Sequence, residues 1–489
     1  MKKISTLVLG LFLVISCSEE DPVEINDRNS DSQEILSVKE INSFIEEELK
    51  RSGDVDWTEA PANVLYSAVV HGNHVLSIGY GRRGESYIEG AKRSDRLNSA
   101  LENIYKVVED SEGISKSNTV LSEDDILNSI DVKITKLVTI ETLQKTDQIR
   151  YLDPIGYSLY VQNGDISNVQ KSAGCSQEGE SINGGDYSVI SPNSHLPWNF
   201  DIHNISQAWN YSTGAGITVG VIDTGISASQ NLLGAGFNDG ISDGRTVQRY
   251  GTYTDGSNDL CGHGTQMSAV LAAPRNNDYM PVGVAYNCNL VSYRATEDVI
   301  LNGYNERKGV SNALKALGNR ADVKIISMSI GYPWSIGNVE DAVKYAYGKG
   351  KMIFAAGGTS TSFTNWIGVI FPADMDETIA VTGIVDNKYK RCNNCHDGEE
   401  IDFTIVMQRA GNADRTVPVL GFNTGTRAYV GGSSVATATT AGIAALVWAR
   451  NPNMSRAQVL DKLKRAGEFY PNRNNRFGYG NIDALKAVK

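Results

Sequence analysis

Residues 219–225 read Val-Gly-Val-Ile-Asp-Thr-Gly, an apolar run that ends in an acidic residue and a turn glycine. A short apolar run without polar alternation is typical of a buried strand in a parallel sheet. Asp223 then lies at the carboxyl end of the strand, the edge at which open α/β sheets bind ligands. The pattern alone is common, because an aspartate before a glycine also caps turns and helices.

The same kind of run recurs along the chain, with helical patterns between the runs. Further strands are predicted at residues 290–295, 324–330, 351–356 and 378–384. Alternation of strand and helix indicates an α/β fold with a mainly parallel sheet covered on both faces. We therefore predict one such domain over residues 194–489.

Two later motifs place reactive side chains at helix starts. Residues 261–265 read Cys-Gly-His-Gly-Thr and open a helix of small residues, while residues 431–437 read Gly-Gly-Ser-Ser-Val-Ala-Thr before an apolar helix. Free N–H groups and the helix dipole favour developing negative charge at such a start, where Ser434 lies. Taken singly, His263 could be a structural or metal-binding residue and Ser434 a helix cap.

Together the three motifs resemble those of the subtilisin family, Asp-Thr-Gly, Gly-His-Gly-Thr and Gly-Thr-Ser-Met-Ala, in the same order and at comparable spacing. The resemblance covers roughly residue 196 to the C-terminus, and it implies a subtilisin-like three-layer fold. It also implies a serine endopeptidase in which Ser434 is the nucleophile, His263 the general base and Asp223 the group that orients the base. By the same resemblance the first specificity pocket is flanked by Ser329, Ile330, Gly331, Ala355, Ala356 and Gly357.

One position departs from the family pattern. Gly358 stands where the family has an asparagine whose amide helps to hold the oxyanion, so of the usual donors the Ser434 backbone N–H remains. In subtilisin the loss of that asparagine costs on the order of 10² to 10³ in turnover. Thr359, Ser360 and Asn365 are candidate substitute donors. The sequence leaves open a slower enzyme, a repaired one, and a catalytically impaired surface protein of the same fold that binds peptides; the intact triad favours an enzyme.

The N-terminus reads as an export signal. Lys2 and Lys3 precede an apolar run that is too short to span a bilayer. Residues 14–17, Val-Ile-Ser-Cys, resemble the bacterial lipobox, and the acidic residues after them resemble the surface-export signal of Bacteroidetes lipoproteins. We expect a lipoprotein signal peptide over residues 1–17, lipidation of Cys17, and an outer-membrane or cell-surface lipoprotein of a Gram-negative, Bacteroidetes-like bacterium. An ordinary signal peptide is the alternative.

The region between the signal and the α/β domain divides into three segments. An acidic tether is predicted over residues 18–36, an α+β domain over 37–160, and a linker rich in Gly, Ser and Asn over 161–193. Within the α+β domain, Ser37 and Glu40 form a capping-box pattern. Residues 64–80 are predicted as a hairpin, because two apolar runs flank turn residues. The domain resembles the propeptide of the subtilisin family, which inhibits its own protease.

Five cysteines remain after Cys17, an odd number in a compartment where disulfides persist. Cys261 lies two residues before His263, and we expect it to form a disulfide that braces the histidine loop. Cys288 is the nearest partner in the sequence.

Residues 392–396, Cys-Asn-Asn-Cys-His, need separate treatment because Cys-x-x-Cys-His is also the attachment motif of c-type haem. A haem-bearing redox protein is therefore a rival hypothesis. The simpler alternatives are a local disulfide, or pairing of these cysteines with Cys261 or Cys288.

Charge and composition limit the partners. The net charge of −12 argues against nucleic acid, whose phosphates require a basic surface. We expect a peptide or protein substrate, the chain's own propeptide as inhibitor, and a membrane reached through the lipid anchor. The chemistry requires no cofactor, and we assign no metal ligand. Structural calcium stays open, because the acidic residues form no contiguous calcium loop.

Overall fold

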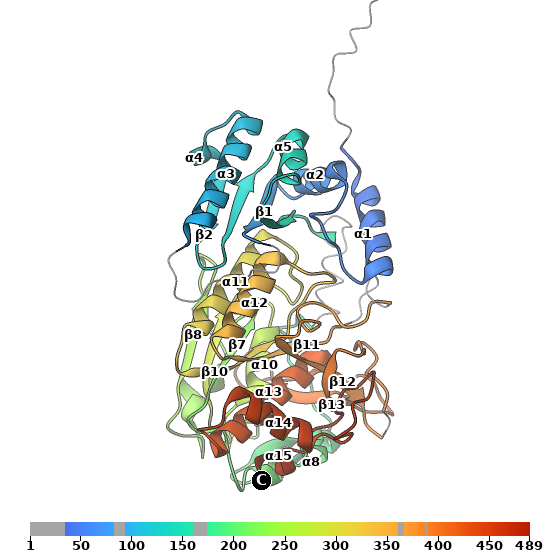
Figure 1. Cartoon of the computed structure of the whole chain (residues 1–489). Helices are drawn as coiled ribbons and strands as arrows, with labels where there is room; N and C mark the ends of the chain where they lie inside the picture. Colours follow the sequence, from blue (N-terminus) through green and yellow to red (C-terminus); the bar gives the residue numbers. More distant parts are fainter. Residues whose placement is uncertain (1–34, 83–92, 160–173, 360–365, 388) are drawn as a thin grey trace, which may run out of the picture. The chain divides into compact units, whose positions relative to one another are not determined.

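The computed structural model describes residues 35–82, 93–159, 174–359, 366–387 and 389–489. Residues 35–489 form one compact unit that contains a four-stranded and a seven-stranded sheet (Figure 1). Cys17, the predicted signal peptide and most of the predicted tether lie outside the described residues.

The larger sheet is entirely parallel, with the strand order β13-β12-β11-β10-β7-β9-β8. It confirms the predicted α/β fold, and the five predicted runs are strands β7, β9, β10, β11 and β12. The sequence missed β8, which is half-exposed and polar, and β13. The strands are β7 Thr218–Asp223, β8 Val247–Gly251, β9 Asn289–Arg294, β10 Val323–Met328, β11 Met352–Ala356, β12 Thr378–Val385 and β13 Ile401–Gln408.

Helices cover both faces of this sheet, which gives three layers. Alternate strand residues point to opposite faces: Val219 and Val221 pack with the core that holds α10 and α13, and Ile222 packs with the core that holds α11 and α12. The helices of this region are α8 Trp198–Ile202, α9 Ile205–Ala208, α10 His263–Ala272, α11 Tyr304–Gly318, α12 Gly337–Gly348, α13 Gly432–Arg450, α14 Arg456–Ala466 and α15 Ala484–Val488, with the 3-10 turns η2 Asn231–Leu233 and η3 Ala235–Asn238.

Helix α13 is the core helix of one layer. Among the described residues it alone is long and apolar enough to cross a membrane, and 89% of its apolar window is buried inside the protein. Its composition is explained by this burial, since a helix that is apolar all round belongs in a core.

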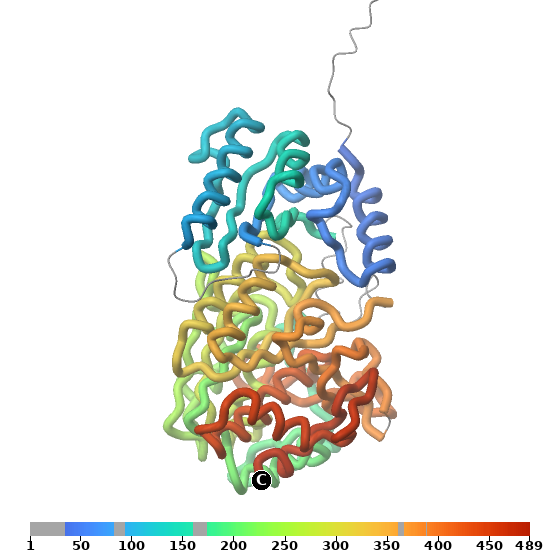
Figure 2. The backbone as a smooth tube through the Cα atoms, viewed as in Figure 1, coloured from blue at the N-terminus to red at the C-terminus, as the bar shows by residue number. Residues whose placement is uncertain are grey.

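The smaller sheet is antiparallel, with the order β2-β3-β1-β4. Figure 2 follows its chain, residues 35–159, from blue to teal. The capping box of Ser37 and Glu40 is present, as predicted. The elements are α1 Val38–Ser52, α2 Ala62–His71, β1 Val75–Tyr80, α3 Asp95–Glu112, α4 Lys116–Thr119, β2 Val120–Asp124, β3 Ser129–Lys133, α5 Leu137–Leu143 and β4 Ile149–Asp153.

The predicted hairpin at residues 64–80 is wrong in its first arm. Residues 62–71 form α2, and only β1 is a strand. The run from Val64 to Val69 is buried on every side, so it carries no period that separates a helix from a strand. Pro61 at the helix start was the available signal, because proline is tolerated there.

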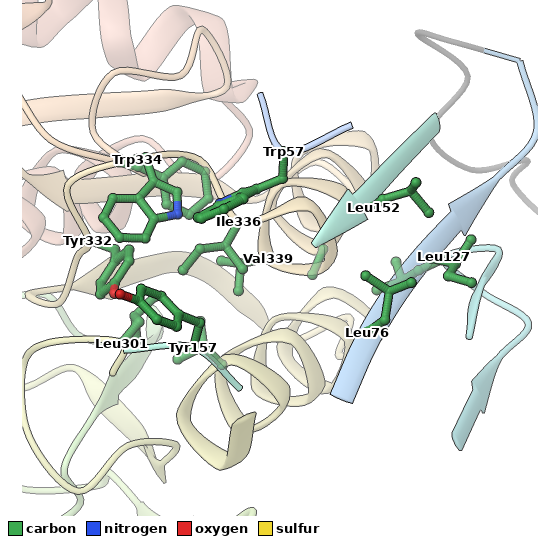
Figure 3. Close-up of a cluster of buried hydrophobic side chains, with 14 of the residues drawn as sticks. Trp57, Leu76, Leu127, Leu152, Tyr157, Leu301, Tyr332, Trp334, Ile336 and Val339 are labelled. Atoms are coloured by element: carbon green, nitrogen blue, oxygen red, sulfur yellow. The ribbon is translucent and has the colours of Figure 1, made fainter. Parts of the chain in front are cut away.

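The two sheets are joined by a shared hydrophobic core between the smaller sheet and helices α11 and α12. Figure 3 shows Trp57 beside Trp334, with ring centroids 6.4 Å apart. Within this region the Arg150 guanidinium donates two hydrogen bonds to the carboxylate of Asp341, each 2.7 Å long. Both side chains of that pair are nearly buried, so loss of either partner would leave a charge without compensation.

The predicted linker over 161–193 is ordered in its second half, which corrects that prediction. Strand β5 Tyr187–Ile190 pairs with β6 Ser194–Pro197, and the turn η1 Gly184–Asp186 precedes it. Asp186 is buried and accepts hydrogen bonds from Arg409, Arg415 and Tyr429. Tyr429 lies on β15 Arg427–Val430, which pairs with β14 Val417–Leu420. Polar contacts fix this segment, and a search for apolar periodicity cannot detect them.

Candidate active site

Asp223 and His263 meet at the carboxyl edge of the parallel sheet. Strand β7 ends at Asp223 and helix α10 begins at His263. His263 Nδ1 donates a hydrogen bond of 2.8 Å to Asp223 Oδ1, which also accepts one from the Thr224 N–H. A proton on Nδ1 leaves the Nε2 lone pair free, and that is the tautomer a general base needs.

The electrostatics of this pair favour a protonated ring once a proton arrives. Burial lowers the pKa of His263, but the charge of Asp223 and the hydrogen bond to it outweigh burial, so the pKa is raised above its ordinary value. His263 is 1% exposed and Asp223 fully buried, so water screens their attraction weakly.

A second carboxylate, missed by the sequence reasoning, holds the loop before His263. Asp259 is buried and accepts hydrogen bonds from the backbone N–H groups of Cys261 and Gly262 and from both the N–H and the hydroxyl of Thr265. Burial raises the pKa of this carboxyl. Its only sequence signal was its position just upstream of the histidine motif.

The glycine after the histidine allows a close backbone approach. A Cβ on Gly264 would lie 2.4 Å from the Gly225 carbonyl oxygen, so no larger residue fits. This contact sets α10 directly against the turn that follows β7.

Ser434 is the third residue of α13, which packs beside α10. It is 7% exposed, and it lines one cavity together with His263. His263 Nε2 has no hydrogen-bond partner, so no bond joins it to the Ser434 hydroxyl in this structure. Such bonds often tighten only when substrate binds. Asp223 is thus bonded to His263, and His263 and Ser434 line one cavity, although the three motifs span about two hundred residues of chain.

A narrow apolar cavity opens on one side of Ser434. Four of the residues predicted to bind substrate line it, namely Ser329, Ile330, Gly331 and Ala356. The other two, Ala355 and Gly357, are not among its described lining residues. The wall is completed by Val299, Ile300, Tyr332, Pro333, Gly358, Thr359, Ile370, Ser433 and Ser434. No charged side chain belongs to this described lining, so the cavity suits an apolar group.

Gly358 has a conformation and a neighbour that exclude the family's asparagine. Its φ is 126°, which strains any residue with a side chain, and a Cβ there would lie 2.6 Å from His396 Nδ1. Ser433 exchanges hydrogen bonds with the Gly358 backbone, its hydroxyl accepting from the N–H at 3.2 Å and donating to the carbonyl at 3.0 Å. The backbone at this position is therefore held firmly.

His396 occupies the space beside Gly358. Its Nδ1 lies 2.7 Å from the Gly368 carbonyl oxygen, which can only accept, so the ring proton is on Nδ1. Burial lowers the pKa of His396 to about 4, which keeps the ring neutral near pH 7. In that tautomer Nε2 carries no hydrogen and cannot donate to an oxyanion.

The disulfides decide between the alternatives for the cysteines. Cys392 pairs with Cys395, which confirms the local disulfide and leaves neither thiol free for haem attachment. Cys261 is disulfide-bonded, as expected, and its partner is Cys175 rather than Cys288, the nearest cysteine in the sequence. Cys288 is free and fully buried in the core at the start of β9, which places it away from the histidine loop. Sequence distance was a poor guide, because Cys175 is 86 residues from Cys261.

Across the described ranges, no group of three or more His, Cys, Asp or Glu side chains is placed to hold a metal ion.

The chain has relatives of known identity. The Subtilase family (Peptidase_S8) matches residues 214–480. Alkaline elastase YaB of Bacillus sp. (strain YaB) is 32% identical over 302 residues, 60% of this chain and 70% of the relative. Subtilisin DY of Bacillus licheniformis is 33% identical over 278 residues, 56% of this chain and 90% of the relative. The crystal structure of fervidolysin from Fervidobacterium pennivorans, a keratinolytic enzyme related to subtilisin, shares the fold, with a TM-score of 0.60 at 17% identity over 85% of this chain and 60% of that one.

Proposed function

The chain belongs to the subtilase family and is a subtilisin-like serine endopeptidase, and on that premise we propose that it cuts peptide bonds through an acyl-enzyme on Ser434. His263 is the general base and Asp223 orients it. The observation that carries this assignment is the buried hydrogen bond from His263 Nδ1 to Asp223, because it leaves Nε2 as the proton acceptor beside Ser434.

Each step moves a proton at a defined atom. The Ser434 hydroxyl attacks the peptide carbonyl while His263 Nε2 takes its proton, and the resulting imidazolium is stabilised by Asp223. Nε2 then gives the proton to the leaving amine. Water repeats the sequence on the acyl-enzyme and releases the acid.

We propose that the oxyanion hole of this enzyme is altered at Gly358 and that Thr359 supplies the missing donor. The Ser434 backbone N–H lies in the first turn of α13, where N–H groups have no partner within the helix. Thr359 lines both cavities that meet at Ser434. Its hydroxyl oxygen lies 3.3 Å from the point where a Cβ on Gly432 would stand, so it lies against the start of α13. The other two predicted substitutes, Ser360 and Asn365, lie outside the described residues.

The α+β region over residues 37–160 acts as the chain's own inhibitor in this proposal. Its last described residue, Leu159, donates its backbone N–H to the Tyr332 hydroxyl at 3.4 Å, and Tyr332 lines the apolar cavity beside Ser434. This contact supports the proposal, because Leu159 is bonded to a residue that lines the cavity beside Ser434. The domain boundaries at 37–160 and 194–489 belong to the same proposal.

We further propose that the enzyme is exported and held at the bacterial surface by lipid on Cys17. The lipobox-like residues 14–17 support this, and two disulfides are consistent with an oxidising compartment. The test is incorporation of a labelled fatty acid in cells, which should disappear in Cys17→Ala. Retained incorporation would refute the anchor.

The assignment of the nucleophile is tested with a fluorophosphonate probe and intact mass analysis of the full chain and of its processed form. We expect one probe adduct on the wild type, none on Ser434→Ala, and an adduct on the matched variant Ser433→Ala. Absence of an adduct from every folded form would favour the alternative, a catalytically impaired surface protein that binds peptides.

A further inference from the structure

Residues 174–180 lie against the catalytic base. A Cβ on Gly174 would lie 3.0 Å from His263 Cδ2 and 3.9 Å from Nε2, and one on Gly262 would lie 2.1 Å from the Ser176 carbonyl oxygen. His263 is 1% exposed with this segment in place. The base is therefore covered by chain from outside the three catalytic motifs.

One end of the segment is fastened to the histidine loop. Cys175 is disulfide-bonded to Cys261, two residues before His263. The Gln177 side-chain amide donates a hydrogen bond of 2.6 Å to the Leu260 carbonyl oxygen. A covalent bond means that this end stays beside the base even if the chain is cut upstream of residue 174.

The other end is fastened to strand β15. The Glu180 N–H donates to the Arg427 carbonyl oxygen at 2.7 Å, and the Glu180 carboxylate accepts from the Tyr429 N–H at 2.6 Å. The segment is thus held at two places, and Gly174 and Ser176 line the same cavity as His263 and Ser434.

The fastened segment forms a wall of a second, polar cavity of about 650 Å³. Gly174, Ser176 and Glu180 line it together with His263 and Ser434. Of the described lining residues, only Thr359 and Ser434 are shared with the apolar cavity. A peptide whose acyl part occupies the apolar cavity can therefore direct its leaving group into the polar one.

We infer that residues 174–180 are a tethered strap that sets specificity on the leaving-group side, favouring small leaving groups over polypeptides that continue past the scissile bond. The inference rests on the proposed function, since it assumes that the two cavities hold the two parts of a substrate. The strap acts by occupying space next to His263, and its covalent bond keeps it there where hydrogen bonds alone would let it exchange with substrate.

The test compares two substrates with the same acyl part. One carries a p-nitroanilide, and the other continues for four residues past the scissile bond between a fluorophore and a quencher. The wild type, as the full chain and in its processed form, is compared with the double variant Cys175→Ser, Cys261→Ser, in which neither partner of the disulfide is left as an unpaired thiol. We expect the ratio of kcat/KM, extended over short, to rise roughly tenfold in the variant, the equivalent of about 1.4 kcal/mol in the transition state. An unchanged ratio overturns the strap.

If the double variant does not fold, the same comparison is made by reducing the Cys175–Cys261 disulfide in the folded wild type. A water-soluble phosphine supplies the two electrons, two protons from water complete the two thiols, and the phosphine becomes its oxide with oxygen from that water. The ratio should rise as in the variant, and the reductant should change nothing further in a folded double variant. A rise of equal size in that variant would show that the effect comes from elsewhere, and it would overturn the inference.

A readout that needs no catalysis separates this inference from the proposed function. In Ser434→Ala, the carbethoxylation rate of His263 by diethylpyrocarbonate, followed by peptide mass analysis, should rise roughly tenfold when the disulfide is reduced. Fully buried His203 is the internal reference. Faster modification supports the strap even if no peptide is cut, in which case only the proposed function fails. An unchanged rate overturns the strap whether or not the enzyme is active.

Discussion

The two sides of Ser434 are built differently. On the base side, Asp223 and His263 act through side-chain atoms, and Asp259 holds the loop between them through four hydrogen bonds. On the proposed oxyanion side, the backbone around Gly358 is held by Ser433, and Gly358 has no side chain that could donate a hydrogen bond. The difference teaches that a proton relay depends on particular side chains, whereas any correctly placed N–H or O–H can stabilise an oxyanion.

The largest effect is expected from breaking the base side at Asp223. Asp223→Asn keeps the volume, but its amide can donate to Nδ1 and so favours the tautomer that leaves no lone pair on Nε2. We expect kcat for a peptide amide to fall by about 10⁴. The free energy of unfolding from urea titration serves as the control for folding. A loss below about 100-fold in a folded variant would contradict the role given to Asp223.

The next effect tests the repair of the oxyanion side. Thr359→Val removes the hydroxyl at nearly constant volume, whereas Thr359→Ser keeps it. If Thr359 donates to the oxyanion, valine should lower kcat by about 10² to 10³ with little change in KM, and serine should retain most of it. Equal kcat values for the two variants would assign the second donor elsewhere.

A smaller effect is expected when the family's residue is restored. Gly358→Asn must adopt a φ near 126° and displace His396, so we expect it to lower the free energy of unfolding by about 2–4 kcal/mol without raising kcat. Urea denaturation and peptide hydrolysis measure the two quantities.

The matched variant Gly358→Asn, His396→Ala removes the ring that meets the new side chain. It should recover part of the lost stability relative to Gly358→Asn alone. A Gly358→Asn enzyme that is as stable as the wild type and has a higher kcat would contradict this expectation. It would show that the backbone at residue 358 and the His396 ring accommodate an asparagine side chain without strain.

The difference between local motifs and tertiary contacts explains which features of the fold and the site could be predicted from the sequence. The parallel strands and the meeting of Asp223 with His263 could be predicted, because apolar periodicity and local motifs decide them. The filling of the space beside Gly358 by His396 could not, since the two residues are 38 positions apart and meet only through tertiary packing. The Cys175–Cys261 disulfide was missed for the same reason. Composition marked residues 161–193 as a linker, because the contacts that fix residues 174–193 are polar and long-range and leave no apolar pattern in the sequence.

The smallest effect concerns pH, and it sharpens the contrast between the two histidines. His263 must be neutral to accept a proton, and its pKa is raised, so kcat/KM should fall as the pH drops through a value above the ordinary 6.5. His396, with a pKa of about 4, stays neutral over this pH range, so its protonation causes no second decrease in kcat/KM there. Removing the negative charge in Asp223→Asn lowers the pKa of His263, so the residual activity should persist to lower pH. A pH–rate profile of both enzymes measures this, and an acid limb that does not move would mean that Asp223 does not set the charge of the base.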